Sequence, residues 1–180
     1  MSQVTHTFPA AGKAAKSSIF ADVSLQNTLI FLLRVSLGWV FLWAAIRQFG
    51  DPKWSAAQFL GGAKTFPGFY AVFMQPEVLP IVNVLVKTGH LLIGLSLISG
   101  ISVRLSSAFG ALLMMLYYFP RLDFPYVGGP TYFIVEYHLV YAMVLVYLGA
   151  VQAGRYGGLA SFVARFEPLA SRPRLRRWLG

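Results

Sequence analysis

The 180-residue sequence contains no cysteine. This absence excludes disulfides, thiolate catalysis, iron–sulfur clusters held by this chain and covalently attached c-type haem. Charged residues are also scarce, at 12%, and only 6 residues are acidic. Any chemistry in this chain must therefore use imidazole, amine, guanidinium, carboxylate or phenol groups, or a bound cofactor. We expect neither a metal site nor a covalent cofactor.

The rest of the amino-acid composition is typical of a membrane protein. Hydrophobic residues make up 57% of the chain and its mean hydropathy is +0.62, which is outside the usual range of a soluble domain. Crossing a bilayer takes about 20 residues, and four segments qualify: 25–49, 79–100, 103–119 and 131–152. Backbone groups cannot stay unpaired in lipid, so these segments are predicted to be helices. We therefore expect an all-α integral membrane protein, a four-transmembrane-helix bundle over 25–153.

Basic residues are distributed unevenly over this topology. Four crossings place both termini on the same side, together with the turn at 101–102 and most of the Lys and Arg residues. The other side has only Arg47, Lys53, Lys64 and Arg121. The positive-inside rule predicts a multi-pass protein of a prokaryotic inner membrane with both termini in the cytoplasm. Arg34, near the cytoplasmic end of the first segment, is expected to bind loop or helix-end carbonyls rather than to act in catalysis.

Three segments outside the membrane helices have distinct predicted roles. Residues 1–24 are polar, do not resemble a cleaved signal peptide, and are expected to form a flexible cytoplasmic arm. Residues 50–78 are interrupted by Gly and Pro but rich in aromatic residues, which predicts a lid on the outer membrane surface. Residues 154–180 predict a cytoplasmic, interfacial amphipathic helix with a basic tail. Much of the +9 net charge lies in this tail, so its expected partner is membrane lipid and not nucleic acid.

Two of the four segments carry ionisable groups near their middle. Lys87 and His90 lie in the second segment, and Glu136 and His138 lie in the fourth. Placing such a group in hydrocarbon costs about 2.5–3.5 kcal/mol, so it usually faces the bundle interior and is paired or used. Helical rise places all four, with Arg47, in the outer half of the bundle.

Helical spacing also predicts the direction of each side chain. Lys87 and His90 are three residues apart and share one helix face, as do His138 and Tyr141. Glu136 and His138 are two residues apart, so we expect them to point in well-separated directions.

Together these groups predict a cationic, imidazole-bearing pocket that opens outward. Arg47, Lys87 and His138 are candidates to hold a small dianion, and His90 or Glu136 to move protons to a quinone in the bilayer. Two other interpretations stay open. Glu136 paired with Lys87 or Arg47 would be a structural ion pair that fixes helix registry. Alternatively, His90 and His138 could ligate a haem b between two helices.

Three stretches of the sequence resemble the DoxX/DoxD family of membrane proteins. They are residues 34–47, which contain the run Arg34-Val-Ser-Leu-Gly38, residues 89–104, which begin Gly89-His90, and residues 136–157, which begin Glu136-Tyr-His138. The similarity covers about 30–160 and implies a four-helix membrane bundle. Many DoxX members carry a carboxylate at the position of His90 and a lysine at that of Arg47, and both differences favour the DoxD branch.

The DoxD branch is the membrane subunit of thiosulfate:quinone oxidoreductase, which converts two thiosulfates to tetrathionate and reduces quinone. The resemblance implies the same activity here, with quinone as electron acceptor. The site residues are then His90, Glu136 and His138 for catalysis, and Arg47, Lys87 and Tyr141 for substrate binding. A second subunit on the outer face is expected, because the chain has little mass outside the membrane. The alternative is a non-catalytic accessory or scaffold subunit of a larger respiratory or photosynthetic membrane complex.

Overall fold

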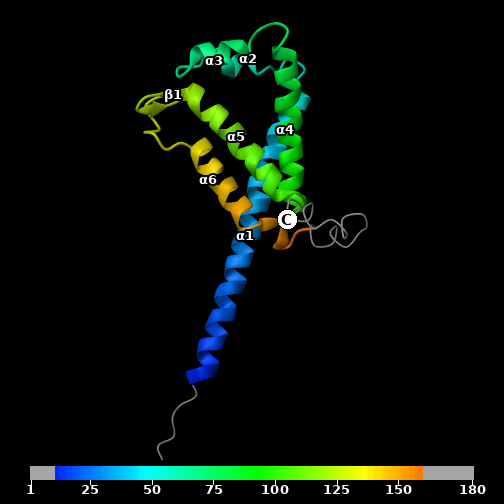
Figure 1. The fold of residues 1–180 in the computed structure, drawn as a ribbon, viewed down its shortest axis with the longest axis vertical. Helices are drawn as coiled ribbons and strands as arrows, with labels where there is room; N and C mark the ends of the chain where they lie inside the picture. The colour runs from blue at the N-terminus through cyan, green and yellow to red at the C-terminus, as the bar shows by residue number, and fades with distance from the viewer. Residues whose placement is uncertain (1–10, 160–180) are drawn as a thin grey trace, which may run out of the picture.

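The computed structural model describes residues 11–159, and their side chains from residue 23 onward. The described chain is mostly helical (Figure 1). Its elements are the helices α1 (Ala11–Gly50), α2 (Ala57–Leu60), α3 (Pro67–Val72), α4 (Leu79–Ser99), α5 (Val103–Arg121) and α6 (Tyr137–Ala150), the strands β1 (Leu122–Asp123) and β2 (Tyr126–Val127), and the 3-10 turn η1 (Ala153–Arg155). Residues 1–10 of the predicted arm and 160–180 of the predicted amphipathic tail lie outside the described residues.

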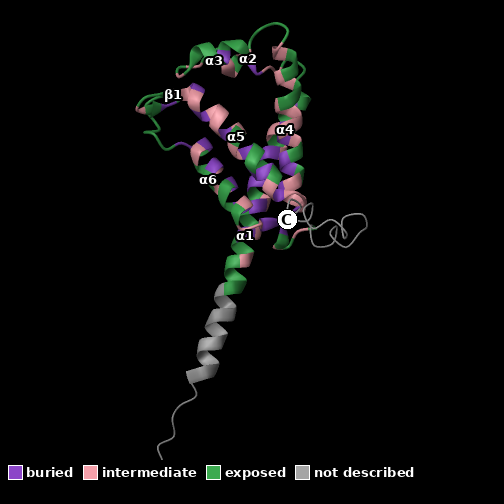
Figure 2. Cartoon of the chain, viewed as in Figure 1, coloured by how far each residue is buried: buried purple, intermediate pink, exposed green. Residues whose placement is uncertain are grey.

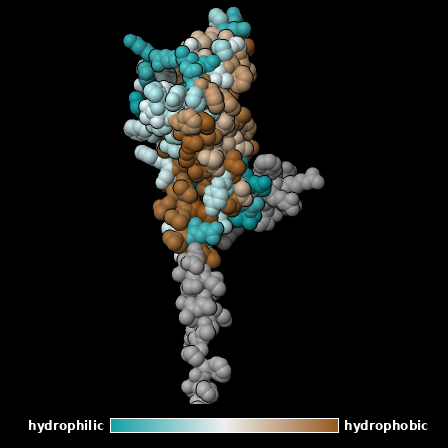
Figure 3. Space-filling model, turned by 90° about the vertical axis from the view of Figure 1, so that its left-hand side faces the viewer, coloured by the Kyte–Doolittle hydropathy of each residue, from teal (hydrophilic) through white to brown (hydrophobic). Residues whose placement is uncertain are grey.

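Three helices are long and apolar enough to cross a membrane, namely Val23–Gly50 of α1, α4 and α5. Figure 3 shows hydrophobic side chains gathered over the middle of the bundle, with hydrophilic groups toward its ends. These features support the predicted multi-pass membrane protein. Helix α1 begins at Ala11, well before the expected start near residue 25.

The predicted fourth helix begins later than expected. Helix α6 starts at Tyr137 and has 14 residues, so it is about 21 Å long, shorter than a hydrocarbon core of about 30 Å. Residues 131–136 are not helical because Ile134 has a positive φ of 55° and Glu136 is extended. The short β1–β2 hairpin before them was not predicted from the sequence either.

The long helices form two pairs, with α1 packed along α4 and α5 along α6. The pairs converge at the end of the bundle that holds the α4–α5 turn, which we call the turn end. They separate toward the other end, the lid end, where α2 and α3 lie (Figure 1). Buried residues concentrate where the pairs converge (Figure 2). Between α1 and α4 the backbones are close, since a Cβ on Gly94 would lie 2.6 Å from the Leu42 nitrogen.

Arg34 holds the turn end together. Its guanidinium is fully buried and donates through Nη1 to the Ala153 carbonyl at 2.8 Å and through Nη2 to the Gly157 carbonyl at 3.3 Å. Gly100 and Gly158 surround it so closely that a Cβ on either would lie 2.6 or 2.7 Å from Nη1. The prediction that Arg34 binds carbonyls near a helix end is confirmed.

The lid, residues 51–78, is attached to the end of α5. The Lys64 backbone N–H donates to the Pro120 carbonyl at 2.8 Å, and the Thr65 hydroxyl donates to the Leu122 carbonyl at 2.6 Å. These contacts hold the lid over the space between the two helix pairs.

Candidate functional site

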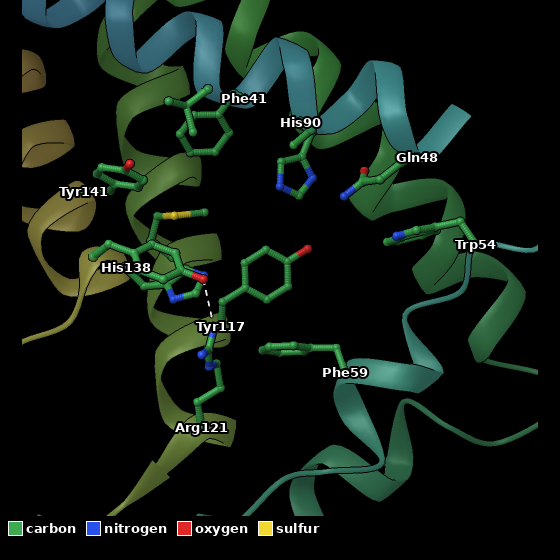
Figure 4. A pocket seen from close by; sticks show the side chains of 13 residues that line it. Phe41, Gln48, Trp54, Phe59, His90, Tyr117, Arg121, His138 and Tyr141 are labelled. Carbon is green, nitrogen blue, oxygen red and sulfur yellow. Dashed lines mark hydrogen bonds between the residues drawn. The ribbon is translucent and has the colours of Figure 1, made fainter. Parts of the chain in front are cut away.

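A cavity of about 340 Å³ lies between the two helix pairs, beneath the lid (Figure 4). Both pairs and the lid contribute side chains to it. The lining residues are Val40, Phe41, Ala44 and Gln48 of α1, Trp54 and Phe59 of the lid, His90 of α4, Met114, Tyr117 and Arg121 of α5, and Tyr137, His138 and Tyr141 of α6. Its walls are mostly aromatic and carry a few polar groups, as in many sites for small organic molecules.

Glu136 and His138 form a directly bonded pair at the start of α6. The His138 Nδ1 lies 2.9 Å from Glu136 Oε1 and 2.8 Å from Oε2, and the His138 backbone N–H donates to Oε2 at 2.9 Å. The prediction that these side chains point in separate directions is wrong. That argument assumed a continuous helix, whereas Glu136 is the N-cap of α6, with φ −130° and ψ 165°, so its carboxylate folds back over the first turn.

Arg121 supplies the positive charge next to this pair. Its Nη1 lies 3.6 Å from Glu136 Oε1, and it donates to the Tyr137 hydroxyl at 2.8 Å. The Glu136 side chain has 0% exposure and that of Arg121 has 32%, so the cation reaches solvent while the carboxylate does not. Glu136 therefore pairs with Arg121 and His138, and not with Lys87 or Arg47 as one interpretation of the sequence proposed.

The hydrogen bonds of the His138 ring determine its tautomer. A carboxylate can only accept, so Nδ1 carries the hydrogen that the ring donates to Glu136. In the neutral ring Nε2 is then an acceptor, and no described residue hydrogen-bonds to it. The carboxylate also stabilises the imidazolium that forms when Nε2 takes up a proton.

His90 is buried on the opposite side of the cavity, on α4. Its Nδ1 lies 2.8 Å from the Val86 carbonyl, which can only accept, so Nδ1 carries the hydrogen here as well. The ring packs against Phe41 at a centroid distance of 5.6 Å. The Nε2 of neutral His90 is therefore an acceptor, like the Nε2 of His138, and both residues line the cavity.

Tyr117 lies between the two imidazoles (Figure 4). Its ring centroid is 5.8 Å from that of His90 and 5.6 Å from that of His138, and Phe59 of the lid packs against it edge-on at 4.8 Å. A haem bound by both histidines would have to displace this ring. Within residues 23–159 there is also no group of three or more His, Asp and Glu side chains that could hold a metal ion.

Two predicted anion-binding residues lie outside the cavity. Arg47 is exposed on α1, and the Lys87 ammonium lies over the rings of Phe49 at 5.9 Å and Trp54 at 5.2 Å. Lys87 thus contacts one face of Trp54, a lining residue, without lining the cavity itself. Tyr141 does line it, as do His90 and His138, whereas Glu136 lies behind His138.

Three lining residues were not predicted from the sequence, namely Gln48, Tyr117 and Arg121. Gln48 falls on the same face of α1 as Phe41, seven residues earlier, and Tyr117 and Arg121 are four residues apart on α5. This helical spacing was the only sequence feature that could have linked these residues to a common site. It did not identify them because only the packing of the pairs shows which helix faces enclose a cavity.

No family model, no curated protein and no solved structure matches this chain.

Proposed function

We propose that this chain is the membrane subunit of a quinone-reducing oxidoreductase, and that the quinone head group binds in the cavity between the two helix pairs. One observation carries the proposal. His138 lines a mostly aromatic cavity with Nε2 available, while its Nδ1 is anchored to a buried carboxylate that Arg121 partly neutralises. Such an arrangement suits proton exchange with a lipid-soluble ligand.

In this proposal α6 completes a fourth crossing together with the non-helical residues 131–136. The backbone of the preceding loop is paired internally, since the Ile134 N–H donates to the Pro125 carbonyl at 2.9 Å and the Tyr118 hydroxyl donates to the Ile134 carbonyl at 2.7 Å. The excess of basic residues near the termini supports an orientation with the turn end in the cytoplasm of a prokaryotic inner membrane. The cavity lies toward the outer face.

The ligand would enter from the lipid, between α1 and α6. Val40 and Tyr137 line the cavity from these two helices, and each is 40% exposed. A quinone with an isoprenoid tail could place its ring inside and leave the tail among lipid chains.

In this proposal, side chains of this chain transfer protons to the quinone. Quinone takes up two electrons and two protons to become quinol. Arg121 and Glu136 orient the His138 ring, which takes up a proton at Nε2 and then donates it to a quinone oxygen. Glu136 stabilises the imidazolium form between these two steps. His90, whose Nε2 also belongs to a cavity wall, stays a candidate for the second proton.

Thiosulfate is the proposed electron donor, on the strength of the DoxD resemblance. Two thiosulfates lose one electron each and join through a new S–S bond to give tetrathionate. Because Arg47 and Lys87 lie outside the cavity, the anion would be handled at the lid end, with a second subunit on the outer face.

The test is quinone reduction by the purified full-length chain in detergent, with thiosulfate as donor and the absorbance spectrum recorded. We expect turnover that falls at least about 100-fold in His138→Phe, the usual range for loss of an acid–base group. The Gln26→Leu variant is the control for folding, because Gln26 is an exposed residue of α1 outside the cavity. Equal rates in the His138→Phe variant and the wild type would contradict the assigned role.

A second candidate function is a non-catalytic accessory subunit of a larger respiratory or photosynthetic complex. The lid end exposes the aromatic side chains of Phe66, Phe69 and Phe124, which are suited to docking on a partner. Stable co-purification with such a complex, combined with tolerance of the His138→Phe substitution, would favour this function over the first.

A further inference from the structure

Gln48 is the one polar side chain of the described cavity lining that is buried with an unpaired atom. It is only 9% exposed, and its Oε1 has no hydrogen-bond partner. Leaving such a group unpaired is costly, so buried amides are nearly always hydrogen-bonded. The amide lies in the wall of the cavity, beside His90 (Figure 4). A ligand in the cavity could supply the missing partner.

His90 and Gln48 present complementary groups to the same part of the cavity. The Val86 carbonyl holds the hydrogen of His90 on Nδ1, so Nε2 can accept a hydrogen bond. The Gln48 amide has an N–H donor and a carbonyl acceptor, and rotation of its end exchanges their positions. Together the two side chains can donate to a ligand carbonyl or accept from a ligand hydroxyl.

These groups belong to the α1–α4 pair, whereas His138 and Arg121 belong to the α5–α6 pair. Tyr117 lies between the two imidazoles (Figure 4). The cavity therefore has polar groups on two opposite walls and aromatic side chains between them. This arrangement fits a flat ring that lies against the Tyr117 ring, with an oxygen at each end, better than a ligand with one polar end.

We propose that Gln48 and His90 form a second binding station for the ligand, so that the ligand is a 1,4-quinone whose two oxygens are bound by opposite helix pairs. This inference rests on the proposed function and adds to it the position of the second oxygen. Gln48 Nε2 donates to the carbonyl of the oxidised ring. Gln48 Oε1 or His90 Nε2 accepts from the hydroxyl of the reduced ring.

The experiment compares two bicyclic probes, 1,4-naphthoquinone and 1-tetralone, of which only the first has a second carbonyl. Their affinities for the full-length chain in lipid nanodiscs are measured by calorimetry. Without cysteine, the chain has no thiol that the quinone could alkylate. We expect the wild type to bind naphthoquinone about tenfold more tightly, as one hydrogen bond to a buried group predicts.

In Gln48→Leu we expect the tenfold preference to fall below about threefold, through weaker binding of naphthoquinone with little change for tetralone. Gln48→Met, which keeps the side-chain length, is the second variant if the leucine variant does not fold. Gln26→Leu is the matched control, because it makes the same change on α1 at an exposed position outside the cavity. It should keep the full preference.

Three outcomes would overturn the inference. Equal affinities of the wild type for the two probes would show that the second oxygen is not bound. An unchanged preference in both Gln48 variants would show that this station does not bind it, and would leave the proposed function standing. If neither probe bound the wild type, the proposed function itself would fail. Binding data separate these cases without depending on turnover or on a partner subunit.

Discussion

The Tyr70 hydroxyl of the lid donates a hydrogen bond to the Leu116 carbonyl of α5 at 3.2 Å. In a regular helix that carbonyl would accept from the N–H four residues later, but residue 120 is proline and has none. The lid thus supplies a donor that the helix lacks. Burial raises the pKa of Tyr70 above its ordinary value of 10.0, so the hydroxyl stays protonated at neutral pH. This contact ties the lid to the helix that carries Tyr117 and Arg121.

Tyr70→Phe should loosen the lid. Loss of the hydroxyl leaves the Leu116 carbonyl without its donor while the ring still packs, so we expect a loss of about 1 kcal/mol in stability. Hydrogen exchange over residues 57–72 should accelerate, with exchange in α4 unchanged. Identical exchange of the lid in the variant and the wild type would show that the lid is held by its other contacts alone.

Glu136→Gln should change the tautomer of His138. The amide can still accept from the His138 backbone N–H, but its NH₂ group then faces Nδ1 and makes that nitrogen an acceptor. The hydrogen moves to Nε2, and the imidazolium loses its carboxylate. We expect ¹⁵N chemical shifts of His138 to show the exchange, and quinone reduction to fall about 100-fold or more.

The control for this substitution is Asp51→Asn, which changes a carboxylate on the exposed lid end. It should leave the His138 shifts and the rate unaltered. A Glu136→Gln protein with the wild-type tautomer would contradict the hydrogen bonding described for the pair.

Arg34→Met should destabilise the turn end. The substitution leaves the carbonyls of Ala153 and Gly157 without their donor and replaces a planar group in a space shaped by glycines. We expect a loss of about 2–3 kcal/mol, measured by thermal unfolding in detergent. Arg34→Lys should recover only part of it, since an ammonium cannot reproduce the planar two-armed contact. Full stability in Arg34→Lys would mean that charge alone matters at this position.

Gly94→Ala should push α1 away from α4. The added Cβ would lie 2.6 Å from the Leu42 nitrogen and 2.9 Å from its Cα, and backbone atoms cannot move aside as a side-chain end can. We expect a loss of at least about 1–3 kcal/mol. Gly89→Ala on the same helix is the matched control, because its Cβ would meet nothing within 4 Å. It should be neutral or slightly stabilising. Equal effects at the two positions would contradict the close packing.

The amino-acid sequence was sufficient to predict three of the four expected helices, and α1, α4 and α5 are long and apolar enough to cross a membrane. It was also sufficient to predict that Arg34 binds backbone carbonyls, because a buried guanidinium near a helix end has few other partners. It placed His90, His138 and Tyr141 in a site, and all three line the cavity. The start of α6 was predicted six residues too early, since hydropathy does not register the backbone turn at Ile134.

The partners of the charged groups came only from the tertiary structure. Hydropathy is a property of each segment, so the helices can be found one at a time. A partner depends on which faces of different helices meet, and on where a helix begins. Because α6 begins at Tyr137, Glu136 caps it and contacts His138, and because α5 packs along α6, Arg121 rather than Lys87 reaches that carboxylate. Lys87 lies instead against Phe49 and Trp54, so its ammonium contacts aromatic rings and not a carboxylate.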